Sequence, residues 1–154
     1  MKTGLVLEGG AMRGLFTAGV IDVLMENNIK FNGAIGVSAG AAFGCNYKSG
    51  QIGRVIRYSK RFANNWKYAS LWSLLTTGDY FGAEYAYHFI PNKLDIVDFE
   101  TFRNNPMEFW AVATTVGSGK AVYRNLKTLD YDELEFISES ASIPHISKEV
   151  NLNG

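Results

Sequence analysis

The chain has 154 residues, of which 47% are hydrophobic and 19% charged, and this composition is typical of one globular domain rather than of a disordered chain. Its 15 Lys and Arg residues balance its 15 Asp and Glu residues, so no excess of charge favours nucleic acid or an anionic membrane as a partner. Cys45 is the only cysteine, which excludes an intrachain disulfide and makes a reducing compartment, the cytoplasm, the simpler interpretation.

The sequence contains no pattern that indicates a metal or a cofactor. One cysteine together with two distant histidines, His88 and His145, does not form a zinc-binding spacing, so we expect no metal site. No apolar run is long enough to span a bilayer. Glu8 interrupts the short apolar run near the N-terminus, so we also expect no secretion signal.

The first expected elements are a strand, a glycine-rich loop and a helix. Residues 4–7 are apolar at consecutive positions, which is typical of a strand in a parallel sheet that is covered on both faces. The glycine-rich stretch 8–14 follows, and a helix is predicted from Leu15 to Asn27. One face of this helix is apolar and is expected to be buried, through Phe16, Val20, Val23 and Leu24.

The next segment carries the strongest motif of the chain. Residues 31–35 suit a short buried strand, and the following five residues read Gly-Val-Ser-Ala-Gly. A strand that turns sharply into a helix holds the middle side chain exposed and strained, and Gly36 and Gly40 remove the Cβ atoms that would clash there. Ser38 would then stand at the positive end of a helix, as a nucleophile does. The alternative is a glycine-rich turn with an incidental serine.

The glycine-rich stretch 8–14 has three interpretations. A dinucleotide site is disfavoured, because Ala11 replaces the second glycine of that fingerprint and no acidic residue follows at the ribose position. A phosphate loop is disfavoured, because the Gly-Lys-Ser/Thr ending is missing. An oxyanion hole fits, since glycine backbone after a strand can aim N–H groups at a negative oxygen beside Ser38. Arg13 either adds positive charge there or pairs with a carboxylate.

The middle of the chain carries two patterns, each with a functional and a structural interpretation. Basic residues alternate with apolar ones, as in an amphipathic helix that contacts a membrane surface or simply faces solvent. These basic residues are Arg54, Arg57, Lys60, Arg61 and Lys67. Aromatic residues are frequent between Trp66 and Phe89, where they either line an acyl-chain pocket over Ser38 or close the domain core.

The following segment leads into a hairpin. His88 lies among the aromatic residues, so we interpret it as a packed or surface side chain rather than as a base. Pro91 is predicted to break the chain, because proline cannot continue a regular helix. Residues 109–116 and 121–124 are predicted to form two strands joined by a glycine-containing turn.

The last element that the sequence predicts is a helix from Tyr131 to about Ser140. Asp130 is interpreted as its N-cap, with Glu133 at the third helical position. No internal repeat and no linker divides the chain. The expected fold class is therefore α/β, with a three-layer, mainly parallel sheet that has helices on both faces and one hairpin.

Together, the two glycine motifs resemble the start of the patatin-like phospholipases. That family combines a Gly-Gly-Gly-x-Arg/Lys-Gly loop with a Gly-x-Ser-x-Gly elbow, and residues 9–14 and 36–40 match these motifs at the same separation. Residues 113–115 and 140–144 extend the likeness. The resemblance implies a serine hydrolase that acts on lipid acyl esters without a cofactor, with Ser38 as the nucleophile. It also implies supporting residues in the oxyanion loop, Gly9, Gly10, Ala11, Arg13 and Gly14, and in the elbow, Gly36, Ala39 and Gly40.

One departure from the family concerns the base. Patatin-like enzymes resemble one another in using a Ser–Asp dyad, with the aspartate in an Asp-Gly turn shortly after the segment that matches 140–144. This sequence has no Asp-Gly dipeptide. We therefore expect residues 1–154 to be the N-terminal portion of a longer patatin-like domain and a poor catalyst alone. The competing hypothesis is a non-catalytic α/β protein that binds a lipid or another partner.

Overall fold

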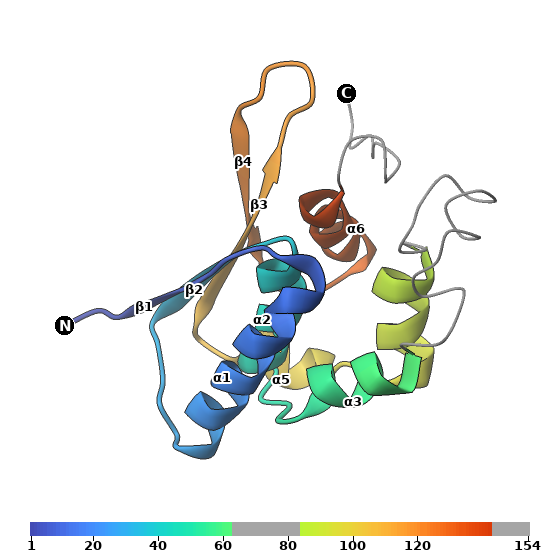
Figure 1. Cartoon of the computed structure of the whole chain (residues 1–154). Coiled ribbons are helices and arrows are strands. Elements are labelled where there is room, and N and C mark those ends of the chain that lie inside the picture. The colour runs from blue at the N-terminus through green and yellow to red at the C-terminus, as the bar shows by residue number, and fades with distance from the viewer. Residues whose placement is uncertain (63–83, 143–154) are drawn as a thin grey trace.

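The computed structural model of the chain describes residues 1–62 and 84–142, which form a mixed sheet with helices packed against it (Figure 1). The strands lie in the order β1 (Gly4–Leu7), β2 (Gly33–Val37), β3 (Glu108–Thr114) and β4 (Ala121–Leu126). The helices are η1 (Ala11–Arg13), α1 (Gly14–Glu26), α2 (Ala39–Lys48), α3 (Arg54–Phe62), the π-helix η2 (Glu84–Leu94), α5 (Phe99–Asn104) and α6 (Tyr131–Ala141). The first three strands are parallel and β4 is antiparallel, so the predicted α/β class and mainly parallel sheet are confirmed.

The register of the parallel strands brings their carboxyl ends together. Leu7 at the end of β1 pairs with Gly36 in β2, and Val37 at the end of β2 pairs with Val112 in β3. The loops that follow β1 and β2 therefore leave the sheet side by side. In an open parallel sheet, this edge is where ligands bind.

One face of the sheet is covered by α2 and α6, which pack against β2 and β3. Gly44 of α2 approaches so closely that a Cβ there would lie 2.6 Å from Leu7 and 2.7 Å from Phe109. On the other face, Val6 is 79% exposed and Tyr123 is 59% exposed. The expectation that β1 is buried on both faces is therefore wrong. The helices expected on this second face are not among the described residues and stay a prediction.

Helix α1 buries the face that carries Gly14, Ala18 and Ile21, rather than the apolar residues that were predicted to face the core. Gly14 and Ala18 are buried, and a Cβ at Gly14 would lie 2.9 Å from both Ala39 and Phe43. Phe16, predicted to face the core, is 81% exposed, and the other predicted core residues of this helix are exposed or half-buried. The predicted face was wrong because periodicity locates an apolar stripe but not its packing partner. The buried face instead carries Ile21 together with Gly14 and Ala18, whose small side chains let α2 approach closely.

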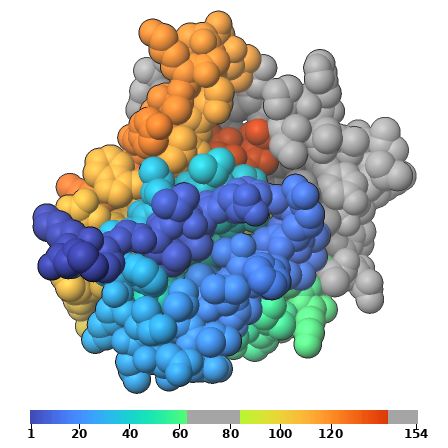
Figure 2. Space-filling model, turned by 60° about the vertical axis from the view of Figure 1, so that its left-hand side comes forward, coloured from blue at the N-terminus to red at the C-terminus, as the bar shows by residue number. Residues whose placement is uncertain are grey.

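The hairpin and the last helix agree with their predictions. The hairpin β3–β4 projects from the body of the molecule, as Figures 1 and 2 show, and Thr114 pairs with Ala121 next to its turn. Asp130 caps α6, with its Oδ1 accepting from Glu133 N at 3.0 Å. The Glu133 carboxylate accepts from the preceding loop, including Leu129 N at 2.7 Å.

Pro91 does not break the chain, contrary to the prediction. It lies inside η2, which continues to Leu94 with the wide turns of a π-helix. Just beyond the end of the helix, Asp95 N donates to Ile90 O at 2.9 Å, a bond that spans five residues. The prediction rested on the tighter hydrogen-bond ladder of an α-helix, which proline interrupts.

Candidate active site

Ser38 lies at the turn between β2 and α2. Its backbone angles are φ 53° and ψ −122°, a strained conformation for a residue with a side chain. The flanking glycines permit this turn. A Cβ at Gly36 would lie 2.5 Å from Gly40 O, and a Cβ at Gly40 would lie 2.2 Å from Leu7 O. Both glycines therefore serve close backbone packing at the turn.

The glycine-rich loop after β1 borders Ser38 directly. A Cβ at Gly9 would lie 3.1 Å from Ser38 Cβ and 3.7 Å from its Oγ. Ala11 is the first residue of η1 and Ala39 is the first residue of α2. The first N–H groups of a helix have no acceptor inside that helix, so these two can donate to a ligand. Both residues line the same pocket as Ser38.

The predicted site residues divide into two groups. The first group lines the pocket: Gly10, Ala11, Arg13, Ser38 and Ala39. The second group has a packing role, and consists of Gly9, Gly14, Gly36 and Gly40. Arg13 lies over the loop, since a Cβ at Gly10 would be 3.6 Å from the Arg13 Nε. Arg13 lines the pocket, and within residues 1–62 and 84–142 it forms no ion pair.

Ala11 adopts a conformation that the sequence did not indicate. Its φ is 47°, in the left-handed region that favours glycine. An alanine at this position still supplies the backbone N–H group that an oxyanion hole needs, as its position in the motif suggested. It does so at the cost of backbone strain, which a glycine at this position would avoid.

The pocket at Ser38 has a volume of about 400 Å³ and apolar walls beyond the loop. Its other lining residues are Met12, Ala42, Phe43, Tyr87 and Ala141. A smaller cavity of about 90 Å³ lies behind it and shares Ala42, Phe43 and Tyr87 as walls. The small cavity continues between η2 and α6, past Ile90 and Leu134. An elongated apolar ligand could extend from Ser38 towards this interior.

Ser140 on α6 is a site residue that the sequence analysis did not identify. Its Oγ accepts from Ser38 N at 2.7 Å and donates to Val112 O at 2.5 Å. One hydroxyl group thus joins the elbow, the end of β3 and the end of α6. Ser140 stands in the segment 140–144 that contributed to the family likeness, but no local pattern pairs it with a residue 102 positions earlier.

The two other reactive side chains near the site are buried away from Ser38. His88 is 6% exposed and does not line the Ser38 pocket, which confirms that it is a packed residue. Cys45 lines the small cavity, and burial raises the pKa of its thiol to about 12. At neutral pH this thiol is protonated and is therefore a weak nucleophile.

The basic stretch in α3 contacts the protein rather than a membrane surface at two positions. Arg54 is 4% exposed, and its Nε lies 3.2 Å from Asp95 Oδ1. The Arg57 guanidinium reaches the same oxygen at 2.8 Å. The prediction of a solvated basic face is therefore wrong at Arg54, which a buried carboxylate after η2 holds inside the protein, whereas Arg57, Lys60 and Arg61 are exposed as predicted. Lys67 lies outside the described residues.

Most of the aromatic segment also lies outside the described residues, from Trp66 to residue 83. Of its described members, Tyr87 lines the Ser38 pocket, and Tyr85 packs edge-on against Phe62. Phe89 stacks on Tyr85 and is 46% exposed. The segment thus contributes both a pocket wall and core packing. Among the helices that the structure describes, none has the length and hydropathy needed to cross a membrane.

The chain was also compared with known families. A family model described as patatin-like phospholipase matches residues 5–154. The matched region includes the loop after β1, the turn at Ser38 and the end of α6, which are the three segments that meet at the pocket. Comparison with curated proteins gives no match.

Proposed function

The chain belongs to the patatin-like phospholipase family, a family of lipid acyl hydrolases, and from this premise we propose that Ser38 hydrolyses lipid acyl esters, in the manner of a phospholipase A. The observation that carries the proposal is the geometry of Ser38. Its φ of 53° places it at a strained turn, beside a glycine-rich loop and open to a pocket of about 400 Å³.

In the proposed reaction, Ser38 Oγ attacks the carbonyl carbon of the ester. The carbonyl oxygen becomes negative and is held by N–H groups of Gly10, Ala11 and Ala39, which line the pocket. Each such donor contributes roughly 2.7–4 kcal/mol to transition-state stabilisation in related enzymes. The positive end of α2, which begins at Ala39, favours the same charge.

The proton of Ser38 needs an acceptor, and we assign this role to an aspartate outside the described residues. Three described aspartates have other partners, and no described aspartate lines the Ser38 pocket. Asp22 accepts from Gly53 N at 2.9 Å, Asp95 pairs with arginines, and Asp130 caps α6. The base passes the proton to the leaving alcohol and then activates a water molecule, which releases the acid from Ser38.

The apolar walls of the pocket favour a substrate with a long acyl chain. Ala42 and Phe43 separate Ser38 from the small apolar cavity, so the acyl chain would lie along them. Ala42→Leu should therefore lower kcat/KM for long-chain esters more than for short-chain ones. Ala121→Leu, at an exposed position in β4, adds the same side chain away from the pocket and should leave chain-length preference unchanged.

The decisive experiment compares the full-length protein with its Ser38→Ala variant, on chromogenic esters of increasing chain length and on phospholipid vesicles. We expect turnover that Ser38→Ala abolishes, and covalent labelling of Ser38 by a fluorophosphonate. Ser118→Ala, in the exposed hairpin turn, is the control. Turnover that survives in Ser38→Ala would contradict the mechanism.

A non-catalytic lipid-binding protein is the second candidate, and one observation favours it. The described residues that line the Ser38 pocket include no carboxylate that could accept the serine proton. This hypothesis predicts fatty-acid binding of equal strength in the wild-type protein and in Ser38→Ala, with no ester turnover by either.

A further inference from the structure

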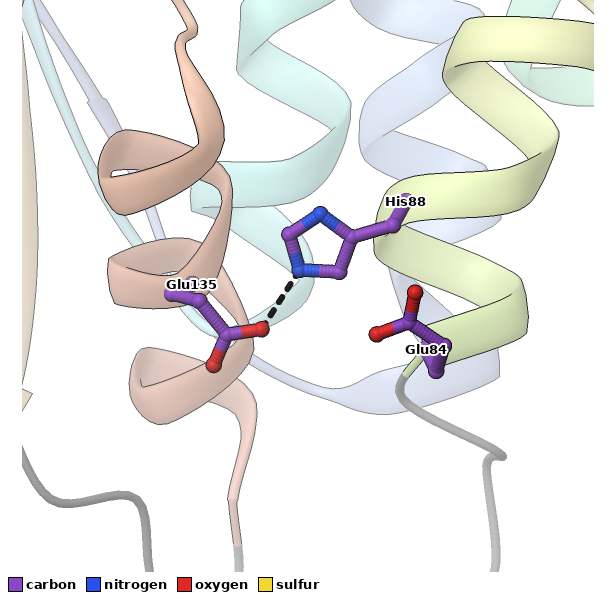
Figure 3. Close-up of side chains that lie close together, drawn as sticks. All are labelled: Glu84, His88 and Glu135. Atoms are coloured by element: carbon purple, nitrogen blue, oxygen red, sulfur yellow. Dashed lines mark hydrogen bonds and ion pairs between the residues drawn. The ribbon is translucent and has the colours of Figure 1, made fainter.

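Three ligand-type side chains meet between η2 and α6, away from the Ser38 pocket. They are Glu84, His88 and Glu135, and their nearest ligand atoms all lie within 4.8 Å of one another. Figure 3 shows Glu84 and His88 on η2, with Glu135 facing them from α6. No metal site was expected from the spacing of histidine and cysteine residues, because this group joins residues from two distant helices.

His88 is oriented towards the two carboxylates. Its side chain is 7% exposed, and its Nε2 lies 2.5 Å from Glu135 Oε1. Tyr131 stacks on the ring with centroids 4.3 Å apart and an interplanar angle of 21°. Burial and stacking together hold the ring so that Nε2 faces Glu135. A ring held in this way loses little freedom when it binds an ion.

The carboxylates lack a permanent cation among the described residues. Glu135 forms its ion pair with His88, which is charged only when protonated, and Glu84 forms none with Lys or Arg. Glu139 stands one turn after Glu135 on α6 and adds a further negative charge. A divalent cation at this place would neutralise the two carboxylates and leave the imidazole neutral.

We propose that Glu84, His88 and Glu135 bind one divalent transition-metal ion of the Zn²⁺ type, with water in the fourth position. An imidazole nitrogen favours Zn²⁺ and its neighbours over Ca²⁺ and Mg²⁺, which prefer oxygen ligands alone. Ligand bonds of about 2.0–2.2 Å around a tetrahedral ion place neighbouring ligand atoms about 3.4 Å apart. Glu135 must therefore move back by roughly 1 Å and Glu84 must move inward by a similar amount. Glu84 is exposed and is free to do so.

The ion would fasten η2 to α6 at a position that bears on the Ser38 pocket. Tyr87, next to His88, lines that pocket. Ser140, on the same helix as Glu135, holds the elbow at Ser38. Metal binding would therefore stabilise one wall of the pocket, and this role does not depend on the reaction that Ser38 performs.

The test is calorimetric titration of the full-length, tag-free protein with ZnCl₂, after treatment with a chelator. We expect one ion per chain, and Glu84→Gln and Glu135→Gln should each weaken binding by at least about tenfold. Glu100→Gln, at an exposed position in α5, is the matched control and should bind as wild type does. Ca²⁺ should produce no comparable heat.

Two further measurements keep the result interpretable. Co²⁺ substitution should give the visible absorption of a tetrahedral site, and Glu84→Gln should remove it. Zn²⁺ should raise the melting temperature of wild type but not of Glu84→Gln, whose exposed side chain can be replaced without loss of packing. Absence of Zn²⁺ binding, or equal affinity in wild type and both glutamine variants, would overturn the proposal.

Discussion

Removal of the Ser140 hydroxyl should slow catalysis without removing the pocket. Ser140→Ala deletes the acceptor of Ser38 N, at 2.7 Å, and the donor to Val112 O, at 2.5 Å. The strained φ of 53° at Ser38 is then held by one hydrogen bond fewer. The backbone of Ser38 would relax, and its Oγ would spend less time in line with the substrate carbonyl.

The size of this effect follows from the two lost hydrogen bonds. Each contributes about 0.5–1.5 kcal/mol net, so the free energy of unfolding should fall by about 1–3 kcal/mol. If about 1–2 kcal/mol of this is also lost from the transition state, kcat falls roughly 5- to 30-fold. KM should change little, because the pocket walls that bind the acyl chain are not altered.

The assay is steady-state ester hydrolysis by the full-length protein, combined with urea unfolding of each variant. Ser142→Ala is the matched control, since Ser142 lies at the same end of α6 and its Oγ donates to Ser138 O at 3.0 Å instead. A folded Ser140→Ala protein with wild-type kcat would refute the argument that this hydroxyl positions Ser38. An equal loss in Ser142→Ala would attribute the effect to α6 as a whole.

Three further predictions concern the packing around the site. Gly40→Ala places a Cβ 2.2 Å from a backbone oxygen of β1 and should lower the free energy of unfolding in urea by more than about 3 kcal/mol. Gly19→Ala is the control: its Cβ would meet no atom of the described residues within 4 Å, and it should raise that free energy by about 0.5–1 kcal/mol. Asp95→Asn leaves the buried guanidinium of Arg54 without its ion-pair partner and should lower the free energy of unfolding by about 3 kcal/mol. Wild-type stability in that variant would mean that the pair is dispensable. Ala11→Gly should gain about 0.5–1 kcal/mol by relieving a φ of 47°, so a lower urea midpoint would contradict the assigned backbone strain.

Features that depend on neighbouring residues could be predicted from the sequence. The glycines at positions 36 and 40 indicate the sharp turn at Ser38, because only residues without a Cβ allow a helix to start so close to the strand. Asp130 indicates the start of α6 for a similar local reason, as its side chain caps the helix within three residues. The βαβ unit then requires the loop after β1 to lie beside Ser38.

Features that depend on distant partners were predicted wrongly or not at all. Periodicity shows that α1 has an apolar stripe, but the face with Gly14, Ala18 and Ile21 is buried instead, because α2 approaches closely at Gly14. The buried role of Arg54 depends on Asp95, which lies 41 positions later.

The contact of Ser140 with Ser38 and the cluster of Glu84, His88 and Glu135 likewise join residues from separate elements. Such contacts are selected by the packing of helices on the sheet, and the packing depends on the whole chain. Local patterns therefore specify the turn that presents Ser38, while the residues that hold and surround it emerge only when η2 and α6 pack against the core.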